Sequence, residues 1–528
     1  MASIKNTGVA YCTVLIIILV VAYPANSTAL DDYLAIPDAN YTKPVYPEGS
    51  FDFSTWTTGY VLRMTSQGWR DPCEVTPHIW QHWVTVIVPG LDLVLGPTKD
   101  TALIYITDGN SYDPAPEIDP QLRNFAAGTR SVVVQLFDVP NQPLYFSDEA
   151  FWRSEDEIIA YSWDKFLNGA DANWPVQLPM VKSVIRCMDM VQEFVGSSDG
   201  PNKTIEHFVL AGGSKRGWTA WLAAATDPNA RVTAVAPIVS DLLNMKYSFA
   251  HHWAAYGFWA DALEPYEQLG IFEWFDDPRV TELLQIVDPY QYRDRLDIPK
   301  FLINAAGDDF FVSDSSRFYI GDFSEETYIR IVPNTDHYLT DAFDSVFNSM
   351  VPYYNAFLND QARPDFSWMV ELDGTITVDV NDEPNSVFLW SAVNEYDRDF
   401  RLVTTGPVWQ SQQLTEQAPG VYLGQVAEPE FGWVAYFVEL VYDNSFADEN
   451  IESGDFRYRF TTEMMVLPEM LPFEADFDHD RFKNASDLQI LSNFWLSENQ
   501  FRDISPRRNR DGIITLEDFA VFSGHWLE

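Results

Sequence analysis

The chain has 528 residues, of which 46% are hydrophobic and 15% aromatic, and its formal net charge is −45. A chain of this length and apolar content can form more than one hydrophobic core and is globular rather than disordered. The negative charge argues against a nucleic-acid partner, because phosphate binding needs clustered lysine and arginine, and against adsorption to an anionic membrane. We interpret the charge as an adaptation for solubility.

The segment 1–29 has the layout of a secretory signal peptide. Lys5 precedes an apolar run over residues 9–23, and a proline and small residues follow. Cleavage is expected after Ser27 or Ala29, and the run is short for a membrane span, with a retained anchor as the alternative. The protein is therefore expected to be secreted, periplasmic or at the cell surface.

Residues 30–360 alternate short apolar runs with helical patterns. A mostly parallel sheet covered by helices is the fold class that this alternation predicts. A tryptophan-rich stretch over 148–196 predicts a helical insertion near the active face, followed by a core helix over 181–195. The predicted strands are 83–88, 103–106, 132–136, 208–210, 232–239, 301–304 and 329–332.

The segment 210–218, LAGGSKRGW, carries the strongest functional signal. It follows a short apolar strand and precedes a helical pattern, so Ser214 lies on a glycine-rich strand-to-helix turn, as the nucleophile of an α/β-hydrolase does. The usual spacing is G-x-S-x-G, whereas here Arg216 holds the place of the second glycine and Gly217 follows it. A plain structural turn and an anion site are the alternatives.

A serine nucleophile needs a histidine base and a carboxylate that orients the base. His337 follows the strand 329–332, and Asp308 and Asp309 follow the strand 301–304. Three loops after strands thus supply serine, acid and histidine in the order expected of α/β-hydrolases. Either Asp308 or Asp309 fits the acid.

Two backbone N–H groups are expected to form the oxyanion hole. One is that of Lys215, directly after the serine. The other comes from the loop after strand 103–106, with Gly109 or Asn110 as the donor. The side chains of Lys215 and Arg216 either pair with acidic groups or bind an anionic substrate group, and we favour the structural role. No cysteine and histidine spacing indicates zinc, and we expect catalysis without a cofactor.

Residues 365–470 show short alternating runs separated by turn signals, including a hairpin over 367–380. This pattern predicts a small β-sandwich-like domain.

The tail, 473–528, contains two related acidic blocks, each followed by a helix. They resemble the paired calcium loops of dockerin modules, which are relatives of the EF-hand loop, and carboxylate and amide oxygens suit Ca²⁺. Arg481 departs from the glycine expected in the first loop, and Arg507 stands at position 1 of the second loop, which is therefore expected to bind no metal. An acidic helix pair that binds nothing is the alternative. Positions 1, 3, 5, 9 and 12 of the first loop are Asp476, Asp478, Asp480, Asn484 and Asp487.

Several long motifs resemble the PhoPQ-activated pathogenicity-related protein family. They include GSKRGWT at 213–219, PIVSDLLN at 237–244, TSQGW at 65–69, LPMVKS at 178–183 and PNTDH at 333–337. The resemblance covers roughly 30–470 and implies an α/β-hydrolase-type fold in an exported protein. Matching to related hydrolases favours Asp308 as the acid, and the family implies no substrate.

We therefore expect a secreted serine hydrolase, an esterase rather than a peptidase, with Ser214, Asp308 and His337 as its triad. The alternative is a non-catalytic extracellular binding or signalling protein on a hydrolase scaffold. The tail would then attach either protein to a protein or cell-surface partner.

Overall fold

The computed structural model describes residues 27–45, 51–53, 56–90, 98–444, 455–505 and 510–526. Residues 1–26 of the expected signal segment therefore lie outside the described residues. Thr28 accepts a hydrogen bond from the Asp31 N–H and caps helix α1 (Ala29–Ala35). Cleavage after Ser27 would keep this cap, whereas cleavage after Ala29 would remove it.

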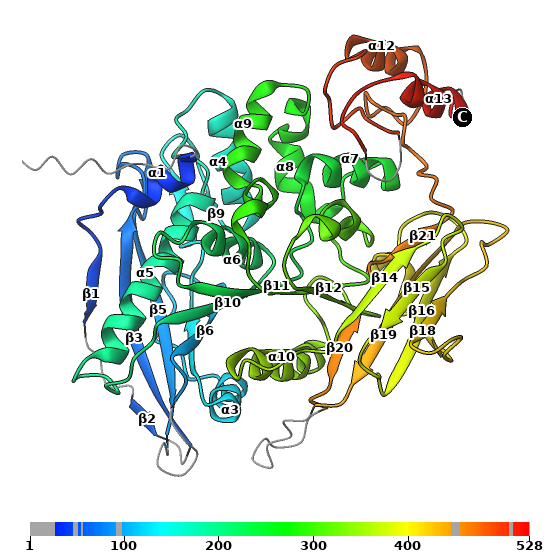
Figure 1. Cartoon of the computed structure of the whole chain (residues 1–528). Helices are drawn as coiled ribbons and strands as arrows, with labels where there is room; N and C mark the ends of the chain where they lie inside the picture. Colours follow the sequence, from blue (N-terminus) through cyan, green and yellow to red (C-terminus); the bar gives the residue numbers. More distant parts are fainter. Residues whose placement is uncertain are drawn as a thin grey trace, which may run out of the picture.

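A long mixed sheet runs through the molecule (Figure 1). Its central strands β7, β6, β10, β11, β12 and β13 lie side by side in that order and are all parallel. β5 and β3 extend one edge in antiparallel pairing. The bounds are β3 Thr57–Gly68, β5 Ile79–Pro89, β6 Thr101–Ile106, β7 Val132–Leu136, β10 His207–Gly213, β11 Val232–Ile238, β12 Lys300–Ala305 and β13 Thr327–Val332.

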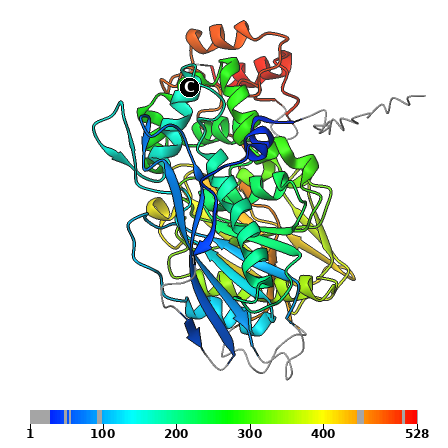
Figure 2. The same ribbon diagram turned by 90° about the vertical axis from the view of Figure 1, so that its left-hand side faces the viewer.

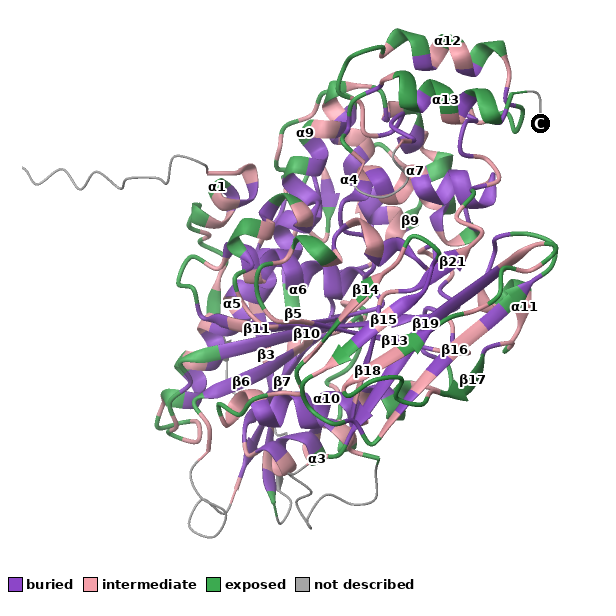
Figure 3. Ribbon diagram, turned by 45° about the vertical axis from the view of Figure 1, so that its right-hand side comes forward, coloured by how far each residue is buried: buried purple, intermediate pink, exposed green. Residues whose placement is uncertain are grey.

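The parallel strands form because they are apolar along their whole length. Every residue of β7 and of β12 is buried, as expected for strands that are covered on both faces (Figure 3). All seven strands predicted in this region are present, so the predicted mostly parallel sheet is confirmed. β3 was not predicted, because its buried and half-buried residues alternate and its apolar run is broken by polar residues.

Helices cover both faces of the sheet (Figure 1). α5 (Gln177–Gly196) and α6 (Lys215–Thr226) pack in the core on one face. α3 (Pro120–Thr129) and α10 (Phe343–Leu358) pack in the core on the other. No helix among the described residues is both long enough and apolar enough to cross a membrane.

The segment expected to form a β-sandwich-like domain instead continues the same sheet. Beyond β13 the order runs through β20 (Tyr458–Thr461), β19 (Trp433–Tyr442), β16 (Ser386–Asn394) and β17 (Gln410–Gln413). β14 (Phe366–Val370), β15 (Ile376–Val380) and β18 (Val421–Gly424) form a second small sheet. Apolar side chains of β15, β16 and β19 share one core, so the two sheets are stacked here without a separate domain core.

A group of helices lies between the sheet and the tail. It comprises α4 (Asp156–Leu167), α7 (Met245–Tyr256), α8 (Glu264–Gln268) and α9 (Pro278–Val287). The tail helices α12 (Ala485–Asn493) and α13 (Leu516–Gly524) have a small core of their own and lie over this group in both views (Figures 1 and 2).

The tail is packed against α7 and the segment just before α9 through specific contacts. The Phe275 and Phe501 rings stack at 4.2 Å, and Arg502 pairs with Asp276 at 2.6 Å. The Trp253 Nε1–H donates to Asp476 at 2.9 Å. The tail is thus in contact with α7, a helix that also lines the candidate active site.

Candidate active site

Ser214 lies on a sharp turn between β10 and α6. Its backbone φ of 56° and ψ of −127° are strained for a residue with a Cβ, as they are in nucleophile elbows. The Ser214 N–H donates to the Ile238 carbonyl at 2.8 Å, which fixes the turn to the end of β11. The turn therefore projects the Ser214 hydroxyl from the carboxyl end of the sheet.

Gly212 and Gly217 make this turn possible despite the unusual spacing. A Cβ on Gly212 would come within 2.8 Å of the Arg216 backbone, and a Cβ on Gly217 within 2.8 Å of the Gly212 carbonyl oxygen. Gly217 thus meets the same packing need as the second glycine of the usual motif, one residue later in the chain.

Ser214, His337 and Asp308 form a continuous hydrogen-bonded chain. The distance between Ser214 Oγ and His337 Nε2 is 2.8 Å. His337 Nδ1 lies 2.8 Å from one oxygen of Asp308 and 3.0 Å from the other. Because an ionised carboxylate only accepts, Nδ1 carries the proton and Nε2 is free to accept from the serine hydroxyl. The three predicted residues are therefore brought together in the geometry of a serine-hydrolase triad.

Asp308 is held in place by its own backbone contacts. Its Oδ1 accepts hydrogen bonds from the N–H groups of Phe310 at 2.7 Å and Phe311 at 3.1 Å. Asp309 makes no hydrogen bond to His337 among the described residues, and burial together with the charge of Asp308 raises its pKa. The geometry thus favours Asp308 over Asp309 as the partner of His337.

The N–H groups of Lys215 and Gly109, which are expected in the oxyanion hole, have no acceptor among the described residues. The Asn110 N–H, which was the alternative, donates to Asp113 at 3.0 Å. The Gly109 loop follows β6, whose Ile106 pairs with Gly212 in the parallel register. The loop therefore begins beside the elbow, at the same end of the sheet.

The side chains of Lys215 and Arg216 point away from solvent into ion pairs. Lys215 Nζ lies 2.8 Å from Glu155 and 2.9 Å from Asp156. Arg216 pairs with Glu155 at 2.5 Å. Both cations are buried and have acidic partners, which agrees with the structural role that we favoured.

A mainly apolar cavity of about 60 Å³ lies beside Ser214, and a wider basin of about 620 Å³ adjoins it. His252, one of two adjacent histidines of α7, lines the cavity. His251 instead pairs with buried Asp314 at 2.7 Å. The apolar wall of the cavity includes Trp163, Trp218, Leu242, Phe249, Phe310 and Val312. Acidic residues of the basin include Glu157, Asp261, Glu264 and Asp309.

Three of the five residues predicted as metal ligands converge in the tail. Asp476, Asp478 and Asp487 each offer a carboxylate oxygen within 4.8 Å of the others. Asp480 is not in this cluster, and its Oδ1 accepts from the Phe482 N–H. The Asn484 Oδ1 accepts from the Ser486 N–H as the cap of α12.

Arg481 takes the backbone conformation expected of the glycine that it replaces. Its φ is 70°, so the left-handed turn of the loop is present despite the side chain. The Arg481 N–H donates to Asp476 Oδ2 at 3.0 Å, and the guanidinium donates to the Gly257 carbonyl at 2.8 Å. Anchoring of this side chain to the end of α7 offsets part of the cost of the strained conformation.

The second tail loop begins earlier than predicted. Asp518 Oδ1 accepts from the N–H groups of Ile504 and Ser505, just as Asp487 Oδ1 accepts from those of Phe477 and Asp478. The counterpart of Asp476 is therefore Asp503, which accepts from the Gly512 N–H. The assignment of Arg507 to position 1 is wrong, because this loop is longer than the first, and Arg507 lies outside the described residues.

The sheet order, the strained serine turn and the triad geometry together define an α/β-hydrolase scaffold. The chain belongs to the PhoPQ-activated pathogenicity-related protein family, whose model matches residues 30–401. The tail lies outside this match.

Similar proteins include one named for a regulatory role and several esterases. Autocrine proliferation repressor protein A of Dictyostelium discoideum is 36% identical over 498 residues, covering 89% of this chain and 97% of that protein. Acetyl xylan esterase 1 from Thermoanaerobacterium is 18% identical, with a TM-score of 0.40 over 62% of this chain and 91% of the esterase. Esterase B from Lactobacillus rhamnosis is 13% identical, with a TM-score of 0.36 over 63% and 91%.

Proposed function

We propose that this protein is a serine hydrolase that cleaves carboxylic esters. The observation that carries the proposal is the hydrogen-bonded chain from Ser214 Oγ through His337 to Asp308. The strained backbone of Ser214 supports it, because such strain is typically found where the chain is held for function. We also propose that the protein is exported, on the basis of the sequence of the segment 1–29.

The proposed reaction follows from the positions of the three side chains. Ser214 Oγ attacks the ester carbonyl carbon while His337 Nε2 takes the hydroxyl proton, and Asp308 stabilises the imidazolium that results. The N–H groups of Lys215 and Gly109 donate to the oxyanion of the tetrahedral intermediate. His337 then gives its proton to the leaving alkoxide, which departs as alcohol. Water, activated by the same histidine, releases the acid from the acyl-enzyme.

The size and chemistry of the cavity favour short acyl groups. Its volume of about 60 Å³ admits roughly four to six water-sized groups. Its wall is mainly apolar, so it suits an alkyl chain, and the acidic basin outside disfavours anionic alcohols.

We therefore expect kcat/KM to be greatest for p-nitrophenyl acetate or butyrate and at least about 100-fold lower for the palmitate, because a pocket distinguishes a single methylene by about tenfold or more and the excess methylenes of the palmitate do not fit. A panel of p-nitrophenyl esters from two to sixteen carbons tests this, with fluorophosphonate-treated protein as the blank. A profile that rises with chain length would contradict the assignment of the cavity as the acyl site.

A second candidate function is that of a signalling protein on a hydrolase scaffold. The observation that favours it is the name of the 36% identical relative, a proliferation repressor. The two candidates differ in one measurable property, the reactivity of Ser214 toward a serine-directed fluorophosphonate. A folded wild-type protein that fails to react would favour the second candidate.

We propose further that the first tail loop binds Ca²⁺ through Asp476, Asp478 and Asp487. The residues fit such an ion, since three carboxylates from loop positions 1, 3 and 12 converge and hard cations prefer oxygen ligands. The bound ion would join Asp476, which accepts from Trp253 of α7, to the start of α12. We also propose that the exposed face of the tail binds a protein or cell-surface partner, as the dockerin resemblance implies.

Asp478→Asn is expected to weaken Ca²⁺ binding at least tenfold, because it removes one charge from an exposed ligand without disturbing a buried side chain. Isothermal titration of EDTA-treated protein with CaCl₂ measures this change. Asp511→Asn, which changes an exposed aspartate of the second loop, serves as the control and should bind as the wild type does. Absence of binding to the wild type, or equal binding by Asp478→Asn, would contradict the site.

A further inference from the structure

Arg216 anchors the helix that carries the nucleophile. It is the second residue after Ser214 and lies in the first turn of α6. Its Nε–H donates to the Val139 carbonyl at 2.6 Å, and its two terminal nitrogens donate to the two oxygens of Glu155 at 2.7 and 2.5 Å. A planar guanidinium held on both edges fixes orientation as well as distance.

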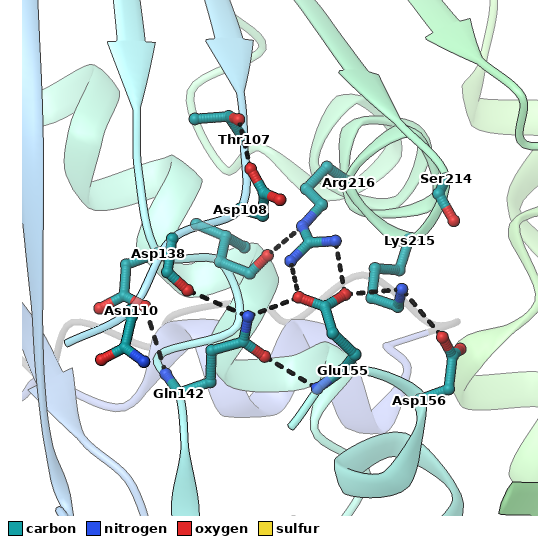
Figure 4. A network of polar contacts seen from close by, with 12 residues as sticks. Thr107, Asp108, Asn110, Asp138, Gln142, Glu155, Asp156, Ser214, Lys215 and Arg216 are labelled. Carbon is teal, nitrogen blue, oxygen red and sulfur yellow. Dashed lines mark hydrogen bonds and ion pairs between the residues drawn. The ribbon is translucent and has the colours of Figure 1, made fainter. Parts of the chain in front are cut away.

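Glu155 is the centre of a network that reaches beyond this ion pair (Figure 4). Its carboxylate contacts Arg216 and also Lys215, at 2.8 Å. Its backbone N–H donates to Gln142 Oε1 at 2.8 Å. Burial raises its pKa, but the hydrogen bonds from Arg216 and the charges of both cations outweigh burial and hold the pKa well below its ordinary value.

The backbone of Glu155 is strained. Its φ is 53° and its ψ is −129°, values that are costly for a residue other than glycine. It occupies the position before α4 but makes no side-chain cap bond to that helix. The strain is therefore unrelated to helix capping and places the carboxylate between Gln142 and the two cations.

Gln142 continues the network to the loop after β6. Its side-chain N–H₂ donates to Glu155 and to the Gly109 carbonyl oxygen, the latter at 3.0 Å. Its backbone carbonyl accepts from the Ser111 N–H at 2.7 Å. Gln142 thus holds the Gly109 loop on both sides of Asn110, and the Gly109 N–H itself has no acceptor among the described residues.

Asp138 also holds the loop after β6, through two hydrogen bonds. Its backbone N–H donates to the Asp108 carbonyl at 3.1 Å, and its carboxylate accepts from the Ser111 hydroxyl at 3.0 Å. A Cβ on Gly109 would lie 3.1 Å from the Asp138 nitrogen, so the two segments are in close contact. The loop is therefore built into the network and has little freedom to move on its own.

We propose that Glu155 is a positioning residue that fixes the Ser214 elbow and the Gly109 oxyanion loop relative to each other. Through Arg216 it sets the first turn of α6, and through Gln142 it holds the carbonyl of Gly109, the residue whose N–H is the second oxyanion donor. The inference rests on the proposed hydrolase function. If the network only stabilised the fold, breaking it would lower the stability without slowing the reaction, as would breaking an ion pair at the other end of the sheet. Stability and reaction rate can be measured separately.

Glu155→Gln is expected to slow the chemical step, because glutamine replaces one of the two acceptor oxygens that face Arg216 with an N–H₂ donor and carries no charge. A misplaced oxyanion donor costs on the order of 10- to 100-fold in rate. We expect that loss in kcat for p-nitrophenyl acetate and in the second-order rate of fluorophosphonate labelling, with KM within about twofold, since ground-state binding is not changed.

Asp189→Asn is the matched control. Asp189 accepts from buried Arg231 at 2.7 Å, and Arg231 precedes β11, at the end of the sheet opposite Ser214. This variant also weakens a buried arginine–carboxylate pair, so it is expected to lower the unfolding temperature as Glu155→Gln does. Its kcat and labelling rate should equal those of the wild type.

Gln142→Met provides a second test in case Glu155→Gln does not fold. It keeps the Arg216–Glu155 pair and removes the side-chain hydrogen bonds that join Glu155 through Gln142 to the Gly109 carbonyl, and the same loss of kcat is expected. The double variant should be no slower than the slower single variant, because both changes break one coupling. Wild-type labelling rates in Gln142→Met and Glu155→Gln, or equal losses in Asp189→Asn, would overturn this inference alone. Absence of labelling in the wild type would instead overturn the hydrolase function.

Discussion

Ser214→Ala is expected to lower kcat for p-nitrophenyl acetate by on the order of 10⁴- to 10⁶-fold, and His337→Ala by a similar factor. The hydroxyl and the imidazole act as one unit, since the 2.8 Å hydrogen bond between them is the path of proton transfer. The double variant should therefore be little slower than either single variant. Ser214 lines the cavity, so the unfolding temperature of Ser214→Ala should differ from that of the wild type by only a few degrees.

Ser66→Ala is a matched control for this experiment. Ser66 Oγ also lies 3.0 Å from a histidine Nε2, that of His82, so the pair resembles Ser214 and His337 in its local contact. It is fully buried, however, and His82 Nδ1 contacts the Phe137 carbonyl oxygen where His337 contacts a carboxylate. Burial also lowers the pKa of His82 to about 4. Ser66→Ala should retain full activity, and equal losses in Ser66→Ala and Ser214→Ala would show that the loss arises from misfolding.

Asp308→Asn is expected to reduce kcat about 10⁴-fold while Asp309→Asn retains activity within a few-fold. The carboxylate of Asp308 accepts from His337 Nδ1–H, which leaves Nε2 free to take the serine proton. An asparagine amide at this position can donate to Nδ1 and thereby favours the wrong tautomer. Asp309 is adjacent in the chain and half-buried but has no such contact, so it is a control of the same residue type.

Steady-state kinetics with p-nitrophenyl acetate measure this difference, and near-ultraviolet circular dichroism checks that both variants are folded. Asp308 also accepts from two backbone N–H groups, so a moderate loss of stability is expected in Asp308→Asn. A reversal, with Asp309→Asn inactive and Asp308→Asn active, would assign the acid to the alternative that the sequence left open.

The central sheet and the triad could be predicted because their signals are local and strong. Strands covered on both faces are read as continuous apolar runs, and all seven predicted runs are strands. The turn at Ser214 is marked by its glycines, and Asp308 and His337 each follow such a strand. Parallel strands bring their carboxyl ends to one edge, so chain order alone placed the three residues together.

The remaining features depend on contacts between distant segments. Glu155 is separated from Arg216 by about sixty residues, and nothing in its neighbourhood in the sequence indicates a strained residue that pairs with the elbow. One strand of 365–470, β20, pairs with β13, a long-range contact that alternating short runs cannot indicate, so a separate domain was expected. The second tail loop is longer than the first, so counting back from Asp518 with the spacing of the first loop gave the wrong first residue. The hydrogen bonds that Asp518 accepts identify Asp503 as the start of the second loop.

The most direct test of the proposed function is to treat the full-length protein with a fluorophosphonate and to locate the adduct by peptide mass spectrometry. A single adduct on Ser214 in the wild type is predicted, together with its absence in His337→Ala. A well-folded wild-type protein with no adduct, or with an adduct on another serine, would contradict the assignment of Ser214 as the nucleophile.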